Sequence, residues 1–472
     1  SLEFLRNQKE FEKDLKNTPI SIGLWVGQAS TPNKIEEVKK ALTDIETECN
    51  KKDVSGDPSS KNVFQISSCP WCGTKIVSQE NNIWKYDFEE SKKEFDLIVF
   101  GAGISGLGIA LAAVRAGYKV MLVEKNQAVC RETSDNTFRI MHGGFRYLQS
   151  LDLPRVLESL HDQKVLFDQY PEIVKSFDCL MPLRSFGLKS RWPLFFGSLF
   201  YNILTLLRVG HLGRSRVLSS EAAISRHPLI SSEAVKYGAL LWQDGRLFSN
   251  DLLAQKLLDQ FRSLGGELLT EHQVLSIDKT ESGYKTKLVN QTREVVLNSK
   301  LAVNALGPWI NSVQKFCGDL FKDLLWARSF NLVVNKNIST EAGLGVEGRS
   351  GRLFFIVPRF SEFQGYHAAI GTFNSVWNGD LSQLTVTPLE IEHAISEFNQ
   401  LGLALQIQSS DVLKVEVGIL PIKKIDNSEP IFYGQEQVRS EAGYIEVLST
   451  KYTTFNSQAE RVLKIINSVL KK

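Results

Sequence analysis

Residues 95–106 read Phe95-Asp-Leu-Ile-Val-Phe-Gly101-Ala-Gly103-Ile-Ser-Gly106, and this stretch decides the fold. Its apolar half predicts a buried strand, and the glycines introduce an apolar helix predicted over 104–116. The first glycine permits a tight turn, the second lets the backbone approach a pyrophosphate, and the third lets the helix pack closely on the strand. A second strand predicted over 119–123 ends at Glu124, whose carboxylate can accept hydrogen bonds from ribose hydroxyls. The sequence therefore predicts a βαβ unit that binds a dinucleotide, FAD or NAD.

The composition of the 472-residue chain is ordinary for a globular protein, with 43% hydrophobic and 23% charged residues. The net charge of +2 gives no reason to expect a nucleic-acid partner. Six cysteines are scattered along the chain, which favours a reducing compartment over a disulfide scaffold. We therefore expect a cytoplasmic protein.

The most apolar stretch of the chain covers residues 192–207. Its 16 residues fall short of the roughly 20 that a transmembrane helix needs. Two interpretations remain: a buried or loop-flanking helix, which is the commoner case, or a peripheral membrane contact. In the second case the aromatic side chains enter the interface and the flanking arginines meet lipid headgroups, at the inner face of the cell membrane.

A second long motif follows the dinucleotide unit: Thr133-Ser134-Asp-Asn-Thr-Phe-Arg-Ile-Met-His142-Gly143-Gly144-Phe-Arg-Tyr-Leu148. Later stretches come in a fixed order: Trp242-Gln-Asp244-Gly-Arg246, Val303-Asn-Ala-Leu-Gly307-Pro-Trp309, Gly351-Arg352-Leu-Phe-Phe-Ile-Val-Pro358 and Lys451-Tyr-Thr-Thr454. Together, over about 95–470, they resemble the FAD-dependent glycerol-3-phosphate dehydrogenases and oxidases. Those enzymes belong to the wider D-amino-acid-oxidase-like flavoprotein family.

The resemblance implies an α/β fold, with a Rossmann-like FAD-binding domain and an inserted substrate domain built on a mixed or antiparallel sheet. The FAD-binding parts would be about 95–150, 245–310 and 440–472, and the substrate domain about 151–244 and 311–439. The resemblance also implies which residues contact the cofactor. They are Gly101, Gly103, Gly106, Glu124, Thr133, Ser134, His142, Gly143, Gly144, Val274 and Gly307.

The activity implied by the resemblance is oxidation of a small hydroxylated substrate, glycerol 3-phosphate or a relative. A base removes the hydroxyl proton while hydride passes to flavin N5, and the electrons leave to quinone or oxygen. His142 is the candidate base, since imidazole titrates near neutral pH. Arg352 is the candidate for binding the substrate anion, with Lys336 in support.

Three departures from the family pattern concern the substrate. Leu420 stands where the family has an anion-binding arginine, Asn378 where it has a lysine, and Ser449-Thr450 where it has two glycines. Arg139, Arg328 and Arg359 are the candidates to replace the missing cations. These departures keep two alternatives open: an amine or hydroxy-acid oxidoreductase, and a flavoprotein without turnover that serves as an interaction module.

Residues 1–80 form a predicted N-terminal module, followed by a polar linker over 81–94. Cys69-Pro-Trp-Cys72 has the spacing of half a zinc ribbon, but a complete site needs four ligands. Reduced, structural thiols are therefore the commoner interpretation of the pair. The module resembles a segment of the helicase-like component of DISARM anti-phage systems, over a much shorter stretch than the flavoprotein resemblance.

Overall fold

The computed structural model describes residues 78–80, 83–85, 94–148, 152–208, 215–290, 294–315, 319–338, 342–348, 351–361 and 365–470. The chain divides into two compact units, Ser1–Lys93 and Glu94–Lys472. In the first unit, strands β1 (Ser78–Glu80) and β2 (Ile83–Lys85) pair antiparallel. The Cys69 and Cys72 pair lies outside the described residues.

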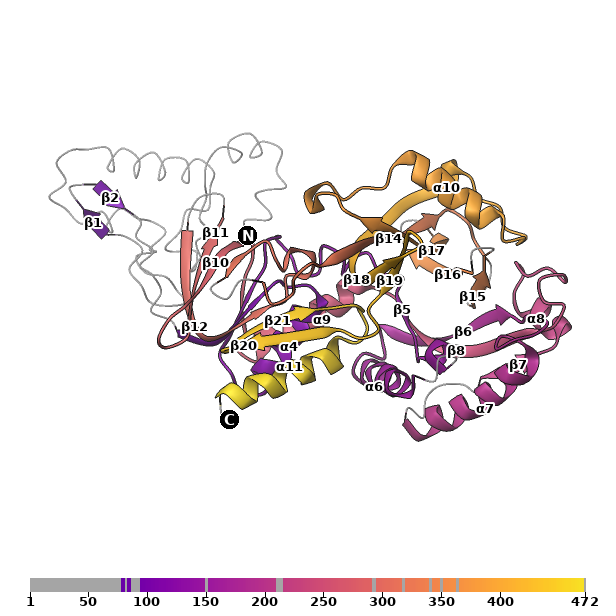
Figure 1. Ribbon diagram of the computed structural model, residues 1–472, viewed down its shortest axis with the longest axis horizontal. Coiled ribbons are helices and arrows are strands. Elements are labelled where there is room, and N and C mark those ends of the chain that lie inside the picture. The colour runs from indigo at the N-terminus through magenta and orange to yellow at the C-terminus, as the bar shows by residue number, and fades with distance from the viewer. Residues whose placement is uncertain are drawn as a thin grey trace, which may run out of the picture. The chain divides into compact units, whose positions relative to one another are not determined.

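One sheet of the second unit contains the glycine motif (Figure 1). Its strands are β3 (Glu94–Phe100), β4 (Val120–Val123), β9 (Glu267–Leu269), β10 (Gln273–Lys279), β11 (Tyr284–Val289), β12 (Glu294–Asn304), β13 (Gln314–Lys315), β20 (Gln437–Glu441) and β21 (Tyr444–Leu448). The main order is β13-β10-β11-β12-β3-β4-β9, and β21 pairs with β12. The pairs β12–β3, β3–β4, β4–β9 and β12–β21 are parallel, so the carboxyl ends of these strands meet at one edge.

Helix α4 (Ile104–Arg115) follows the glycine motif and packs against α9 (Asn250–Ser263) and α11 (Phe455–Leu470). The three helices share one hydrophobic core with β3 and β4, and Figure 1 shows α11 beside α4. The predicted helix over 104–116 and the predicted strand over 119–123 are confirmed. The Rossmann-like arrangement is therefore present, and it is completed by chain segments far apart in sequence.

The second sheet is mixed, as expected of the substrate domain. Its strands are β5 (Ile140–Met141), β6 (Val174–Pro182), β7 (Arg216–Leu218), β8 (Ala239–Leu247), β14 (Leu325–Val334), β15 (Gly343–Glu347), β16 (Leu353–Ser361), β17 (Gly365–Trp377), β18 (Val412–Asp426) and β19 (Glu429–Phe432). The order is β19-β18-β14-β17-β16-β15-β6-β8-β5, with β7 beside β8. Only the β15–β6 pair is parallel among the described strands of this sheet.

The two faces of this sheet carry different helices. Phe354 and Ile356 pack in one core with helix α10 (Pro388–Asn399). Leu353, Phe355 and Val357 point to the opposite face, because side chains alternate along a strand. On that face lie α5 (Phe145–Leu148), α6 (Leu153–Gln169) and α7 (Arg191–Arg208). The shorter elements are α8 (Ser220–Arg226) and the 3₁₀ turns Gly307–Trp309, Leu381–Gln383 and Ser409–Asp411.

Helix α7 contains the apolar stretch over 192–207, and it is not buried. Large apolar side chains along it are exposed, from 42% at Phe200 to 74% at Leu207. None of the helices in the described part of the chain has the length and apolar character needed to cross a membrane.

Candidate functional site

The turn after β3 requires glycine. Gly101 has φ +90°, and a Cβ there would lie 2.6 Å from the carbonyl oxygen of Ala305. A Cβ on Gly106 would lie 1.8 Å from the carbonyl oxygen of Gly101. Gly103 is the N-cap of α4, so the first N–H groups of the helix lie at this turn. The turn is therefore shaped by missing side chains and offers backbone donors to an anion.

Glu124 lies at the end of β4, and its side chain is buried. One carboxylate oxygen accepts a hydrogen bond from the Ala102 N–H at 2.8 Å, and the other accepts from the Asn126 N–H at 2.9 Å. A carboxylate has about four lone-pair sites, so acceptor capacity remains for ribose hydroxyls. Val274 on β10 packs in the same core cluster as Val123, which ends β4. The His272 N–H, two residues before Val274, donates to the Glu124 carbonyl oxygen at 3.0 Å, so the start of β10 lies beside the end of β4.

The segment at Thr133 and Ser134 bridges the two sheets. Ser134 Oγ accepts a hydrogen bond from the Ile104 N–H in the first turn of α4, at 3.1 Å. Thr133 Oγ1 accepts from the Ile419 N–H of β18, at 3.2 Å. Leu420, which replaces the arginine of the family pattern, directly follows this contact. The cofactor segment and the substrate sheet are therefore joined at a defined point.

The loop after β12 reaches the same place. Gly307 has φ +58°, and a Cβ there would have no heavy atom within 4 Å. The preceding residues, Ala305 and Leu306, lie against Gly101. The two loops are therefore in contact at Gly101, while the space beside Gly307 is open. This cradle, with its backbone donors, its buried acid and its cavity beside His142, fits FAD.

A cavity of about 300 Å³ lies between the second sheet and the loop after β5. Its lining includes His142, Phe145, Lys189, Trp242, Asp244 and Phe355. The apolar rings make up much of the wall, and the ring centroids of His142 and Phe355 are 5.4 Å apart. The cavity therefore combines an apolar wall with an imidazole, a carboxylate and an amine.

Asp244 is the centre of the polar contacts in this cavity. Its side chain is 1% exposed and accepts hydrogen bonds from the Gly143 N–H at 2.8 Å and from Trp242 Nε1 at 3.0 Å. His142 Nδ1 lies 2.9 Å from the same carboxylate. Antiparallel pairing of β5 with β8 sets Met141 opposite Gly245, which brings the two side chains together. A carboxylate can only accept, so Nδ1 is the donor nitrogen, and a neutral His142 presents Nε2 as its acceptor.

The two glycines after His142 let the loop lie close to α6 and α7. A Cβ on Gly143 would lie 2.1 Å from the hydroxyl oxygen of Tyr201 on α7. Gly144 has φ +91°, and a Cβ there would lie 3.0 Å from the Cα of Val156 on α6. Larger residues would move His142 away from Asp244. The sequence motif indicated the glycines but not the partner helices.

The cavity-lining cation is Lys189, and the sequence analysis did not find it. Its amine pairs with Glu347 at 2.9 Å. Arg352 instead pairs with Glu429 at 3.1 Å and Glu397 at 3.5 Å. Its neighbours Gly351 and Leu353 line the cavity, whereas Arg352 is not among the described lining residues. The strand alternation that puts Leu353 on the cavity face sends Arg352 to the other side.

The other candidate cations also have carboxylate partners. Lys336 pairs with Asp411 at 3.0 Å, and buried Arg328 pairs with Glu390. Arg359 pairs with Glu416 at 2.7 Å, and Arg139 lies 3.8 Å from the same carboxylate. Burial, and then the neighbouring Arg359 charge, lower the pKa of Arg139. Among the described residues, none of these four lines the cavity beside His142.

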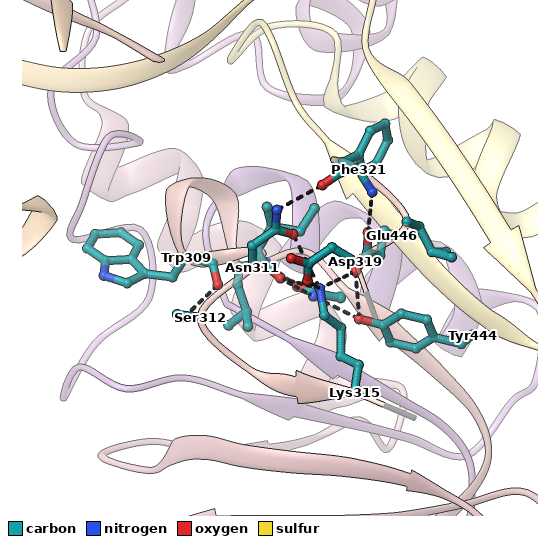
Figure 2. A network of polar contacts seen from close by, with 12 residues as sticks. Trp309, Asn311, Ser312, Lys315, Asp319, Phe321, Tyr444 and Glu446 are labelled. Carbon is teal, nitrogen blue, oxygen red and sulfur yellow. Dashed lines mark hydrogen bonds and ion pairs between the residues drawn. The ribbon is translucent and has the colours of Figure 1, made fainter. Parts of the chain in front are cut away.

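A buried polar network supports the loop after β12, as Figure 2 shows. Lys315 and Glu446, 1% and 0% exposed, pair at 2.7 Å. Tyr444 donates to Glu446 at 3.1 Å, and Asn304 at the end of β12 donates to Tyr444 at 2.9 Å. The network joins β12, β13 and β21 beneath the loop that carries Gly307. Lys315 also pairs with Asp319, four residues on, but its buried partner Glu446 is 131 residues away, and no sequence motif pointed to it.

Comparisons with known proteins agree with this geometry. The family model described as FAD dependent oxidoreductase matches residues 96–444. The aerobic glycerol-3-phosphate dehydrogenase of Staphylococcus aureus (strain USA300) is 24% identical over 395 residues, covering 80% of this chain and 68% of that protein. The structure of glycerol-3-phosphate dehydrogenase from Bacillus halodurans complexed with FAD aligns with TM-score 0.61 and 21% identity, over 81% of this chain and 66% of that one.

A glycine oxidase from Geobacillus kaustophilus has the same fold, with TM-score 0.56, 15% identity and coverage of 79% and 95%. The chain spans about two thirds of the length of the glycerol-3-phosphate dehydrogenases that it matches. The family match covers more than half of the chain and contains the glycine turn, Glu124 and the His142 motif. The chain belongs to the FAD-dependent oxidoreductase family of D-amino-acid-oxidase type, and its cofactor is FAD.

Proposed function

We propose that the protein oxidises a small hydroxylated substrate, glycerol 3-phosphate or a relative, with His142 as the base. The observation that carries the proposal is the His142–Asp244 pair, 2.9 Å apart, in a cavity of about 300 Å³. A cavity of this size suits a small metabolite. When bound, FAD supplies the oxidising chemistry by accepting a hydride from the substrate carbon.

The chain's own residues supply position and proton transfer. Asp244 fixes the imidazole and stabilises the charge that forms when His142 takes the hydroxyl proton at Nε2. The rings of Phe145, Trp242 and Phe355 form an apolar wall of the cavity against which a bound substrate would lie, while the His142 side chain is 45% exposed. Deprotonation of the hydroxyl and loss of hydride then leave the substrate as a carbonyl compound.

We propose that the cofactor lies along the glycine turn and the bridging segment. Gly101, Gly103, Gly106 and the N-terminus of α4 would hold the pyrophosphate, and Glu124 the ribose. Further contacts would come from Thr133, Ser134, Gly143, Gly144, Val274 and Gly307. The FAD-binding parts would then be about 95–150, 245–310 and 440–472, with the substrate domain between them.

The anionic end of the substrate would meet Lys189, which lines the cavity. Its partner Glu347 also pairs with Arg184 at 2.9 Å, so the three groups together carry one net positive charge. Arg352 stays a prediction as a second anion-binding group, and it would have to exchange Glu397 and Glu429 for the substrate. A single free positive charge suits a carboxylate at least as well as a phosphate, which normally takes several donors.

The second candidate is therefore oxidation of a small hydroxy acid or amine on the same scaffold. Leu420 in place of an arginine and Lys189 as the cavity cation favour it. The two candidates share the His142–Asp244 pair and differ in the substrate's charged end.

We further propose that electrons leave to quinone or oxygen and that the protein is cytoplasmic and peripheral at the inner face of the cell membrane. Residues 192–207 would make the contact, since exposed apolar side chains line α7. Such a helix lies in the plane of the interface and does not cross it.

The test is anaerobic addition of substrates to the purified, FAD-loaded protein. Glycerol 3-phosphate should bleach the long-wavelength flavin band of the wild-type protein. The His142→Gln variant should bleach more slowly. Bleaching by hydroxy acids or amines alone would select the second candidate. If no substrate of either class bleaches a folded, fully loaded protein, the enzymatic proposal is wrong and a flavoprotein without turnover remains.

A further inference from the structure

A second, smaller pocket has a wall of arginine and phenylalanine side chains. Its volume is about 20 Å³, which leaves room for about one water-sized group. The wall includes Phe138, Arg139, Arg246, Phe248, Arg359 and Phe360. Among the described residues, this pocket shares no lining residue with the cavity beside His142. A ligand bound here would therefore not displace a substrate bound there.

The pocket brings together Arg139 and Arg359, two of the candidates to replace the missing family cations. Their carboxylate partner among the described residues is Glu416, which lies 2.7 Å from Arg359 and 3.8 Å from Arg139. Two guanidinium groups share one carboxylate, so the three groups keep one net positive charge. Burial, and then the Arg359 charge, lower the pKa of Arg139, because like charges lie side by side. An anion in the pocket would relieve this repulsion.

Both arginines also have hydrogen-bond donors to offer. Arg359 is 7% exposed, and its Nη1 donates to Glu416 and its Nη2 to the Thr137 carbonyl oxygen at 3.0 Å. Arg139 Nη1 donates to the Phe248 carbonyl oxygen at 3.3 Å. The Nε atoms of both arginines are buried and have no hydrogen-bond partner in the part of the chain that the structure describes. A ligand that accepts from such a donor is favoured, because a buried donor left unpaired is costly.

The rim of the pocket is aromatic and open. Phe248 is 43% exposed and Phe360 is 59% exposed. The Arg246 Cζ atom lies 4.5 Å from the centroid of the Phe248 ring, and Arg246 Nη1 donates to the Pro358 carbonyl oxygen at 3.3 Å. The guanidinium group of Arg246 is therefore held against the rim, where an apolar part of a ligand would also lie.

We propose that this pocket is a second ligand site, which binds a small organic carboxylate. The carboxylate group lies among Arg139, Arg246 and Arg359, since a guanidinium fork matches a planar carboxylate with two parallel hydrogen bonds. The apolar remainder of the ligand covers Phe248 and Phe360. A phosphate group is bulkier than the space available and has no apolar part to cover the rim.

Calorimetric titration of the FAD-loaded protein with hexanoate tests the proposal. We expect one hexanoate per chain, with binding at least about ten-fold weaker for the uncharged hexanamide, which cannot pair with the guanidinium groups. Acetate, which lacks the apolar chain, and inorganic phosphate should also bind more weakly than hexanoate. Absence of hexanoate binding would overturn the site. Equal binding of hexanamide or phosphate would overturn the assignment of its ligand as a carboxylate.

Substitutions decide which pocket the hexanoate occupies. Arg139→Gln should weaken its binding at least about ten-fold, and Arg139→Lys less, because lysine keeps the charge but not the fork. Phe360→Ser should weaken binding as well, because a polar side chain replaces part of the rim. Lys189→Met should bind hexanoate as the wild type does. Arg226→Gln is the matched control, because it removes an arginine from an exposed pair with Asp178.

Loss of binding in Lys189→Met would place hexanoate in the cavity beside His142 and overturn the proposal. If Arg139→Gln does not fold, Arg246→Gln should show the same loss of hexanoate binding. FAD content is measured for each variant from its visible absorbance. A folded Arg139→Gln or Arg246→Gln protein without FAD would show that the arginines hold the cofactor, which would also overturn the proposal. None of these readouts needs turnover, so failure of the proposed reaction leaves them intact.

Discussion

The two ends of the proposed site are built by different means. At the nucleotide end, Gly101 and Gly106 create the binding turn because any side chain there would collide with the backbone. At the substrate end, His142 and Asp244 create the chemistry by pairing side chains from two strands that are 102 residues apart in sequence. A local motif therefore specifies the first end, whereas the fold as a whole specifies the second.

The largest effect should come from filling the turn. Gly106→Ala places a methyl group 1.8 Å from the Gly101 carbonyl oxygen, so the helix must move off the strand. We expect the variant either to purify without bound FAD or not to fold. The flavin-to-protein absorbance ratio measures the FAD content. Gly402→Ala is the control: Gly402 also has positive φ, its Cβ meets open space, and the strain costs only about 1–2 kcal/mol. Normal FAD content in Gly106→Ala would show that the turn tolerates a side chain.

The second-largest effect is expected from substitutions at the substrate end, which should leave FAD binding unchanged. His142→Gln should lower turnover by about 10²–10⁴-fold with unchanged FAD content, because it removes the proton acceptor. Asp244→Asn should act in the same direction by releasing the imidazole. His161 is exposed on α6, and the turnover of His161→Gln should stay within about two-fold of wild type, as expected of a surface substitution. Turnover that survives His142→Gln would contradict the base assignment.

The outcome at each end explains what could be predicted from the sequence. The predicted strands and helices of the βαβ unit are confirmed because glycine spacing and apolar periodicity act over a few residues. The cavity cation was missed because Lys189 has no motif and enters the site only through the fold. Arg352 shows the converse: its motif is present, but strand alternation places it beside Glu397 and Glu429.

The buried pair of Figure 2 offers a comparison between an interior charge and a surface charge. Lys315→Met removes the cation that pairs with buried Glu446 and leaves it only the hydrogen bonds from Tyr444 and the Phe321 N–H, so we expect a loss of about 3–5 kcal/mol in the free energy of unfolding. Lys164→Met breaks the exposed i,i+4 pair with Asp168 and should cost at most about 0.5 kcal/mol. Denaturant unfolding measures both. Lys315→Met/Glu446→Gln should recover much of the loss, because the amide oxygen can still accept a hydrogen bond and no unpaired charge is buried. A failure to recover would assign Lys315 a packing role.

A pH-dependent effect on stability is expected where helix α6 packs against helix α11. Asp162 on α6 accepts a hydrogen bond from the Ser457 N–H of α11 at 2.9 Å, and burial raises its pKa to about 7. The folded state thus keeps a proton that the unfolded state releases near pH 4. Stability from this group is complete below about pH 4 and is lost as pH rises to about 7, at about 1.4 kcal/mol per pKa unit.

Asp162→Asn should remove this dependence. Its melting temperature, relative to wild type, should therefore be higher at pH 8 than at pH 5. The same difference at both pH values would show that Asp162 is charged throughout.

The smallest expected effect concerns the substrate anion. Lys189→Met should raise KM by about ten-fold, since a hydrogen bond to a charged group contributes about 1.5–3 kcal/mol. Arg352→Met should change KM less, because its present partners are carboxylates on the other side of β16. A larger effect at Arg352 would mean that this side chain turns into the cavity when substrate binds.

The pairing of β12 with β21 sets the time at which the cofactor site can form during synthesis. The glycine motif is made at residues 101–106, but β21 at Tyr444–Leu448 and helix α11 come about 340 residues later. At ribosomal rates of about 5–20 residues per second, the first strand waits roughly 17–70 s for its last neighbours. During that interval the surface of α4 that α11 covers is exposed, and so, once residues 294–304 are made, is the edge of β12 that pairs with β21. The nascent chain is therefore exposed to aggregation until α11 is made, and FAD loading belongs after that point.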